Sequence, residues 1–228
     1  MILNRQIVME REDSFAHPVY SPNVIEFVTV SREFCGWVEN LKDQPSREFV
    51  NTALKILPLM YLKASMLPQL EMELDGFLEQ TVTEEEYEIL SLMIQAKMGG
   101  SDDYLEVFTA DMQRSDLPLS SSVSENIADI YQDVKDFLMN YRTAVTEIMN
   151  DALVKLVNNF QTYWGQRLVN VLRALHQIYY SNAELGDNSA PTFDVDKDSD
   201  EIKTDHWFIS QRQKEWQDEH LPDFDDLE

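Results

Sequence analysis

The residues of this chain best suited to binding chemistry are three bases that share one acid-poor segment. Arg167, Arg173 and His176 lie within residues 150–181, which contain no Asp or Glu after Asp151, in a chain of formal net charge −24. Guanidinium groups bind carboxylates and phosphates, and an imidazole can exchange a proton near neutral pH. The three side chains are therefore candidate ligands for a small anion or an acidic substrate.

Arg167 is the member of this group that most needs a partner. Apolar residues recur at spacings of three and four along the segment, and on this helical period Arg167 falls on the apolar side with Ile178. Because an uncompensated buried guanidinium is costly, we predict a structural ion pair with an acid from another helix. The alternative is an anion-binding cleft that Arg167 forms with Arg173 or His176. Trp164, one turn earlier, is a candidate ring for cation–π contact and completes the ligand-binding set.

Four carboxylates at helical spacing form a second candidate group, which could hold metal ions. They are Glu125, Asp129, Asp133 and Asp136. Helical bundles that bind two metal ions combine Glu residues with Glu-x-x-His pairs, and the chain contains no such pair. Since the stripe lies opposite the apolar positions of its own helix, we predict a solvated face and no metal site.

A further acidic cluster resembles a calcium-binding loop only in part. Asp194, Asp196, Asp198 and Asp200 alternate, but Ser199 stands where such a loop requires glycine. We interpret this stretch as an acidic linker.

The remaining residue types give no catalytic pattern. His17, His176, His206 and His220 are scattered, without a serine or cysteine motif that could form a nucleophilic site. Glycine-rich phosphate loops are also missing from the sequence. Cys35, the one cysteine, is predicted to be a small buried hydrophobe. The sequence therefore predicts no cofactor and favours a non-catalytic protein over an enzyme.

The charge of the chain restricts its partners. A formal charge of −24 argues against direct binding to nucleic acid or to an anionic membrane, since both require Lys and Arg to neutralise phosphate. An unknown protein partner, including a basic one, fits this charge better. No apolar run approaches the ~18 residues of a membrane-spanning helix, and the amino terminus lacks the apolar core of a signal peptide. We expect a cytoplasmic protein.

The segments that must position these residues are predicted to be helical. Six glycines and eight prolines in 228 residues are too few for a strand-and-turn architecture. Start signals predict helices near Ser21, Ser46, Thr83, Asp103 and Ser122. Pro58 predicts a kink or a restart, and the apolar residues from there to Pro68 are expected to be buried. A turn is expected between Arg142 and Asn150, because one unbroken helix would be about 80 Å long. The predicted fold is an all-α bundle of about six to eight helices around the long central helix 150–181.

The carboxyl-terminal part differs in composition from the rest. Residues 183–228 contain 15 acidic and 4 basic residues, which predicts a flexible acidic tail next to a bundle domain of residues 1–182. Trp207, Phe208 and Trp216 stand out in this tail, within a possible short helix. They are candidates for binding a partner or for docking on the bundle itself.

Two stretches of the sequence resemble a family of uncharacterised bacterial proteins, catalogued only as a domain of unknown function. These stretches are IADIYQDVKDFL at residues 127–138, and YWG at 163–165 followed by LVNVLRALH at 168–176. The resemblance covers about residues 23–182 and implies a helical cytosolic protein. It implies no activity, cofactor or catalytic residue.

Three functions remain open from the sequence. The preferred one is a non-catalytic protein-interaction or adaptor protein, supported by the missing catalytic pattern and by ten methionines, which suit adaptable packing surfaces. The first alternative is an acidic protein that masks the basic surface of a nucleic-acid enzyme. The second is a helical protein that binds a ligand or acts as an enzyme through Arg167, Arg173 and His176.

Overall fold

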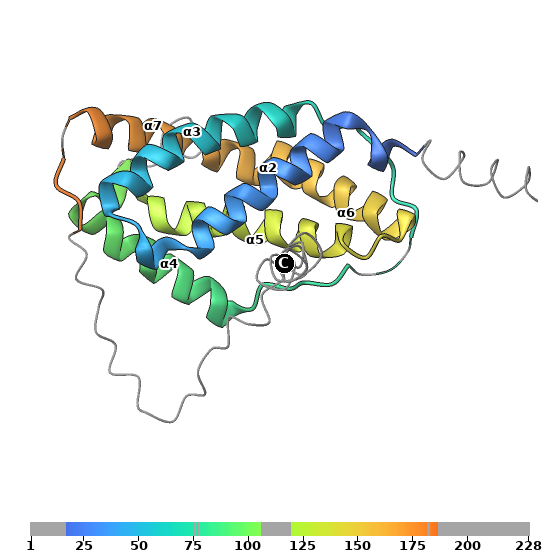
Figure 1. Cartoon of the computed structure of the whole chain (residues 1–228), viewed down its shortest axis with the longest axis horizontal. Coiled ribbons are helices and arrows are strands. Elements are labelled where there is room, and N and C mark those ends of the chain that lie inside the picture. Colours follow the sequence, from blue (N-terminus) through green and yellow to red (C-terminus); the bar gives the residue numbers. More distant parts are fainter. Residues whose placement is uncertain (1–16, 75, 77, 106–119, 182, 187–228) are drawn as a thin grey trace, which may run out of the picture. The chain divides into compact units, whose positions relative to one another are not determined.

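A computed structural model describes residues 17–74, 76, 78–105, 120–181 and 183–186 of the chain (Figure 1). Its contacts divide the chain into two units, residues 1–190 and residues 191–228, and the second lies entirely outside the described residues. The described part is mostly helical, as predicted, with one short antiparallel strand pair. Among these residues, no helix combines the length and the apolar character that crossing a membrane requires.

The first two long helices begin close to their predicted starts. Helix α2 spans Pro22–Glu39, and its first residue is a proline, which lacks the backbone donor that a first helical turn leaves unpaired. Helix α3 spans Ser46–Ser65. The prediction that Ser46 caps α3 is wrong, because Pro45 holds that position and the Ser46 hydroxyl donates to the carbonyl of Gly186. Helix α3 also continues through Pro58 without restarting.

Helix α4 spans Glu84–Met98 and begins with the predicted capping box. The Thr83 hydroxyl accepts from the Glu86 N–H, and the Glu86 carboxylate accepts from the Thr83 N–H. The helix ends at Gly99, whose φ of 56° lies in the left-handed region that glycine tolerates. A Cβ there would meet the backbone nitrogen of Gly186 at 2.9 Å.

A strand replaces the start of the helix predicted from Asp103. Strand β1, Asp103–Leu105, pairs antiparallel with β2, Ser120–Ser122, and residues 106–112 lie outside the described part. The Asp102 carboxylate accepts from both the N–H and the hydroxyl of Ser124. These bonds tie Asp102 to the chain just after β2, so the residues that follow it run beside that strand instead of starting a helix.

Three helical segments complete the fold. Helix α5, Val123–Tyr141, starts at the predicted cap, where the Ser122 hydroxyl accepts from the Glu125 N–H. The expected turn follows, with Ala144 at a φ of 56°. Helix α6, Thr146–Asn159, then passes through the π-helical turn Phe160–Trp164 into helix α7, Gly165–Tyr180. The predicted long segment 150–181 is therefore helical nearly throughout.

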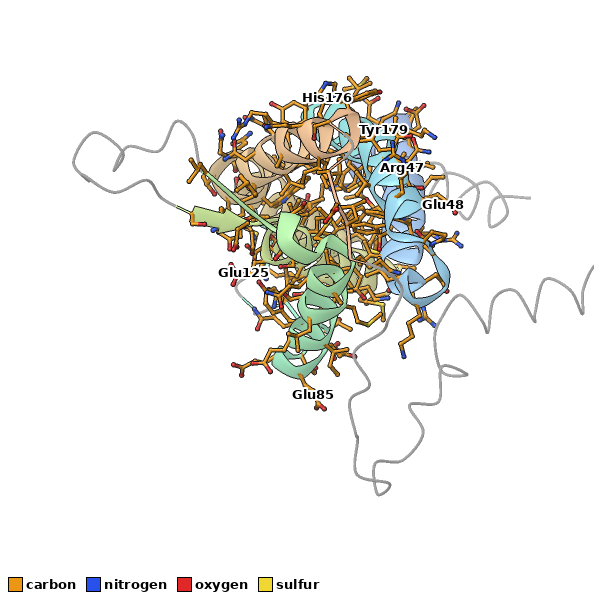
Figure 2. The ribbon with its side chains drawn as sticks, turned by 90° about the vertical axis from the view of Figure 1, so that its left-hand side faces the viewer. Arg47, Glu48, Glu85, Glu125, His176 and Tyr179 are labelled. Carbon is orange, nitrogen blue, oxygen red and sulfur yellow. The ribbon has the colours of Figure 1, made fainter. Side chains whose placement is uncertain are left out.

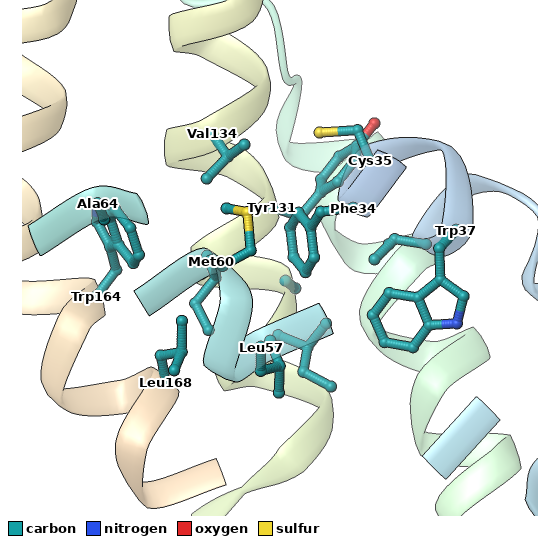
Figure 3. Close-up of a cluster of buried hydrophobic side chains, with 14 of the residues drawn as sticks. Phe34, Cys35, Trp37, Leu57, Met60, Ala64, Tyr131, Val134, Trp164 and Leu168 are labelled. Atoms are coloured by element: carbon teal, nitrogen blue, oxygen red, sulfur yellow. The ribbon is translucent and has the colours of Figure 1, made fainter. Parts of the chain in front are cut away.

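The core lies where α2, α3, α5 and α7 meet. Figure 3 shows Phe34, Met60, Val134 and Leu168, one residue from each of these helices, and all four are fully buried. Cys35 is buried beside them, as predicted, and burial raises the pKa of its thiol. Helix α5 is central because α2, α4, α6 and α7 all pack against it.

Candidate functional site

The carboxylate stripe of α5 does not form the solvated face that its helical period predicts. Glu125 is exposed, whereas Asp129 and Asp133 are half-buried and Asp136 is buried. The prediction fails because helices pack around most of the circumference of α5, so the side opposite its apolar residues is covered as well. Each inward carboxylate therefore needs polar partners.

Arg167 meets one of these carboxylates, which confirms the predicted ion pair. Its Nη1 lies 3.4 Å from Oδ2 of Asp129 and donates to Oδ1 of Asn126 at 2.6 Å. The guanidinium also lies over the ring of Tyr163, 4.2 Å from its centroid. Trp164 does not supply the ring, because it is fully buried on the core side. Arg167 thus has an acid, an amide and a ring as partners within the protein.

Asp129 links three helices through two phenols. The hydroxyls of Tyr87 on α4 and Tyr163 in the π-helical turn each donate to one of its oxygens at 3.0 Å. Burial raises the pKa of both phenols, and the nearby Asp129 charge raises it further. Both tyrosines therefore remain protonated donors, and the cluster fastens α4 and the α6–α7 segment to α5.

The other predicted ligand residues lie apart from Arg167. Arg173 is exposed and donates to the carbonyl of Leu105 at 3.0 Å. His176 is exposed, and its ring centroid lies 4.6 Å from that of Tyr180 on the same helix. Arg167, Arg173 and His176 share no contact in the described part of the chain. The predicted partner-binding residues Trp207, Phe208 and Trp216 lie outside that part.

A long connection between α3 and α4 crosses the bundle and is held by buried polar side chains. We call residues 67–83, described except at 75 and 77, the strap; it runs from the end of α3 past α6 to α4 (Figure 1). At its first fixed point, Asp151 accepts from the N–H groups of Glu73 and Leu74 at 2.7 and 2.9 Å. The side-chain amide of Asn150 donates to the carbonyl of Glu71 at 2.7 Å.

The second fixed point repeats the first on another helix. Asp136 accepts from the N–H groups of Thr81 and Val82 at 2.7 and 3.1 Å, and Asn140 donates to the carbonyl of Glu79 at 2.8 Å. In both cases a carboxylate binds two consecutive N–H groups, and an amide binds the carbonyl two residues before them. These bonds satisfy backbone groups of the strap at part-buried and buried positions.

A pocket lies between the strap and α6. Its volume is about 640 Å³, and its lining includes Met72, Leu78, Gln80, Lys155, Asn158 and Asn159. A small hollow of about 10 Å³, close to the space that one water molecule needs, shares three of these residues and reaches Asp133 and Asp136. The volume of the pocket falls in the range typical of small-molecule sites.

The ionisable groups at this pocket are unequally paired. Asp133 accepts from the side-chain amide of Asn159 at 2.8 Å. Burial raises the pKa of Asp133, against the lowering effects of Asn159 and Lys155. The half-buried Lys155 makes no hydrogen bond and no ion pair with any described residue. Its ammonium group nevertheless favours the charged form of the nearby Asp133 carboxylate.

A different surface lies on α3, where the predicted burial of the residues after Pro58 is wrong in part. Met60 is fully buried, but Leu59, Leu62 and Met66 are 41%, 53% and 44% exposed. Helices α2 and α7 flank α3, and its remaining side has no helix over it in the described part (Figure 1). We call these three residues the α3 apolar row.

Charge is distributed unevenly over the helices. Figure 2 places Arg47, Tyr179 and His176 on the α3 and α7 side, and Glu85 and Glu125 on the α4 and α5 side. The Arg47 guanidinium lies over the ring of Tyr179, 4.8 Å from its centroid. The acid-poor segment recognised in the sequence forms part of the first side, which also carries the exposed Glu48 of α3.

Sequence reasoning missed Lys155 and three of the four side chains that hold the strap, and it named Asp136 only as part of the carboxylate stripe. A signal for them was present, since Asn150, Asp151 and Asn140 interrupt apolar helical positions. Nothing in the period of a helix, however, indicates that a distant loop supplies the missing hydrogen-bond partners.

Comparison with known proteins supports the observed fold. A family model described as "Domain of unknown function (DUF5063)" matches residues 18–181. Among solved structures, the chain is similar to the crystal structure of protein BF1032 from Bacteroides fragilis, with 45% sequence identity and a TM-score of 0.66. That match covers 72% of this chain and 97% of the other. No curated protein matches the chain.

Proposed function

The chain belongs to the DUF5063 family of domains of unknown function, and we propose that it is a non-catalytic protein-interaction module. The observation that carries this proposal is the α3 apolar row. Leu59, Leu62 and Met66 follow one another three and four residues apart, so they form one continuous stripe on the surface of α3. A contiguous exposed apolar stripe is typical of a surface that binds another protein.

The residues around the row favour a neutral or acidic partner. Helix α3 carries Arg47, Lys55 and Lys63 against one acid, Glu48, although the chain as a whole is strongly acidic. Lys55 lies one turn before Leu59 and is exposed. We propose that the row supplies the apolar contact and that this lysine steers an acidic partner segment toward it.

The experiment compares two variants of the full chain in affinity purification from the native host. Leu62→Asp places a charge in the row, and Ile25→Asp places the same charge on α2 at a position of matched exposure, 51% against 53%. We expect Leu62→Asp to lose partners that the wild type and Ile25→Asp retain, with unchanged thermal unfolding of both variants. Equal recovery of all partners by the three proteins would refute the proposal.

A second surface supports the alternative of an acidic protein that masks a basic one. Helix α4 exposes Glu85 and Glu88 beside Ile89 and Leu92, which are 42% and 46% exposed. A basic partner would meet charge and apolar contact together on this side. Binding lost in Leu92→Lys, kept in Leu62→Asp and weakened by salt would favour this role over the first.

The same proposal includes the location of the protein, its number of helices and the role of its tail. We place the protein in the cytoplasm, as a bundle of about six to eight helices with a flexible acidic tail. In this tail Trp207, Phe208 and Trp216 would form a second anchor for a partner. Support comes from the composition of residues 183–228, with 15 acidic and 4 basic residues. Deleting residues 191–228 and repeating the purification measures what the tail contributes.

A further inference from the structure

We propose that the α3 apolar row is one half of a larger docking surface, that the outward stripe of α7 is the other half, and that the occupant is an acidic amphipathic helix of a partner protein. The outward stripe of α7 consists of the exposed residues Gln166, Val169, Arg173, His176 and Tyr180. This inference rests on the proposed interaction function and names the kind of segment that the surface binds.

The outward stripe lacks carboxylates although it faces solvent. Its residues follow one another three and four positions apart, so they lie along one side of the helix. Val169 and Tyr180 are 43% and 67% exposed. Helix α7 contains no Asp or Glu, in a chain with 42 acidic residues. Burial therefore does not explain why acids are missing from this stripe, whereas an acidic partner does.

The stripe and the α3 apolar row lie on neighbouring helices. Helices α3 and α7 run antiparallel, because Tyr61 contacts Phe160 near one end and Arg47 contacts Tyr179 at the other (Figure 1). Lys55 lies between Arg47 and Tyr61, and one turn before the row. It therefore joins the apolar half of the surface on α3 to the acid-free half on α7.

The charges of the two helices favour an acidic occupant. Helices α3 and α7 together contain one acid, Glu48, and five bases, which are Arg47, Lys55, Lys63, Arg167 and Arg173. Lys55 and Arg173 are both exposed. Arg173 donates to the carbonyl of Leu105 at 3.0 Å, and its guanidinium has further N–H groups that can bind a carboxylate.

The shape of the surface suits a helix. From Met66 to the level of Tyr180 the surface follows the whole of α3, about 30 Å or roughly 20 residues of a partner helix. Two antiparallel helices offer a shallow groove in which such a helix can lie. Leu59, Leu62 and Met66 would meet its apolar side, and Lys55 and Arg173 its carboxylates.

Other occupants fit the charges less well. Nucleic acid requires more Lys and Arg than this face offers, and a second copy of the chain would bring its own charge of −24. At physiological ionic strength, charges more than about 8 Å away are largely screened. A short acidic segment therefore responds to the bases it touches more than to distant acids.

The test measures binding of two designed peptides to the full chain by fluorescence anisotropy. The probe is a helix of about 20 residues with leucines on one side and glutamates on the other, and its neutral analogue has glutamine at each glutamate position. We expect Arg173→Glu and Lys55→Glu each to weaken binding of the probe at least about tenfold and to leave binding of the analogue unchanged. Arg173→Lys should retain the probe. Arg32→Glu, at an exposed position of α2, is the matched control and should bind as the wild type does.

A further variant separates this inference from the proposed function. Leu62→Asp should weaken binding of both peptides. If it weakens neither, or if neither peptide binds the wild type, the row is not a docking surface and the proposed function fails as well. If Leu62→Asp weakens both while Arg173→Glu and Lys55→Glu leave the probe unaffected, the row stands and the acidic partner is refuted. Lys55→Glu keeps this comparison valid if Arg173→Glu, which loses its bond to Leu105, fails to fold.

Two further measurements distinguish other occupants. A wild type that sediments as a dimer, with Arg173→Glu as a monomer, would assign the surface to a second copy and overturn the proposal. Probe binding that tightens at least about tenfold when Asp194, Asp196, Asp198 and Asp200 of the full chain are replaced by Asn would assign it to the chain's own acidic residues instead of a partner.

Discussion

Asp136 on α5 and Asp151 on α6 hold the strap in the same way, since each carboxylate accepts hydrogen bonds from two consecutive backbone N–H groups. An Asn assists each of them by donating to the carbonyl two residues earlier in the strap. Buried carboxylates that first suggest chemistry therefore act here as supports for a loop. Substitution of these carboxylates should therefore lower the stability of the fold more than it affects binding.

Removing either support should destabilise the fold. In Asp151→Ala the N–H groups of Glu73 and Leu74 lose their acceptors, so we expect the free energy of unfolding to fall by about 2–4 kcal/mol in chemical denaturation. Amide hydrogen exchange should accelerate first at these two groups. Glu85→Ala, at an exposed position, should change stability by less than about 0.5 kcal/mol. If Asp151→Ala lowers the free energy of unfolding by less than about 0.5 kcal/mol, water has replaced the carboxylate as the acceptor of these hydrogen bonds.

The ion pair of Arg167 should contribute modestly to the stability of the fold. Its side chain is 35% exposed, so solvent screens the attraction to Asp129, and Arg167→Met should lower the free energy of unfolding by about 1 kcal/mol. Arg32→Met, at an exposed position of α2, serves as the control and should lie within about 0.5 kcal/mol of the wild type. If Arg167→Met proves more stable than the wild type, the pair is dispensable for folding and a ligand role for Arg167 gains support.

Asp133 should make stability depend on pH in the acid range. Because burial raises its pKa in the folded state, the folded protein binds this proton more tightly than the unfolded chain does. Stability from this group is therefore present below the unfolded pKa of about 3.9 and is lost as the pH rises through the folded pKa. Asp133→Asn, whose amide oxygen can still accept from Asn159, should raise the melting temperature at pH 7, with a gain that vanishes near pH 3.

The matched control for this effect is Glu85→Gln, which neutralises an exposed carboxylate on α4. Its melting temperature should follow that of the wild type at both pH values. A gain for Asp133→Asn that stays constant with pH would show that the ionisation of Asp133 is not its source.

The π-helical turn depends on a glycine. A Cβ at Gly165 would meet the carbonyl oxygen of Phe160 at 2.3 Å, so Gly165→Ala must shift the backbone and should lower the free energy of unfolding by about 1–3 kcal/mol. At Gly100 a Cβ meets nothing within 4 Å, and Gly100→Ala should be neutral or slightly stabilising. Calorimetric melting of both variants checks this difference, and equal melting temperatures would contradict it.

Local signals in the sequence were sufficient to predict much of the helical framework. The capping box at Thr83, the cap at Ser122 and the turn after Arg142 all occur where the sequence predicts them. These features depend on neighbours within a few residues, so periodicity and side-chain chemistry reveal them. The strand at Asp103 escaped prediction because its residues pair with residues 15 to 19 positions later, and this pairing is fixed by the bonds between Asp102 and Ser124.

Much less of the candidate site could be predicted from the sequence. From Arg167 alone, the sequence predicts the need for a partner, and the tertiary structure decides that this partner is Asp129. A helical wheel likewise assigns the α5 carboxylates to water, because it counts only the apolar face of one helix. Packing of α4, α6 and the strap on the other face turns them inward. Composition and period thus determine which segments become helices, whereas long-range packing alone decides which polar groups are brought together.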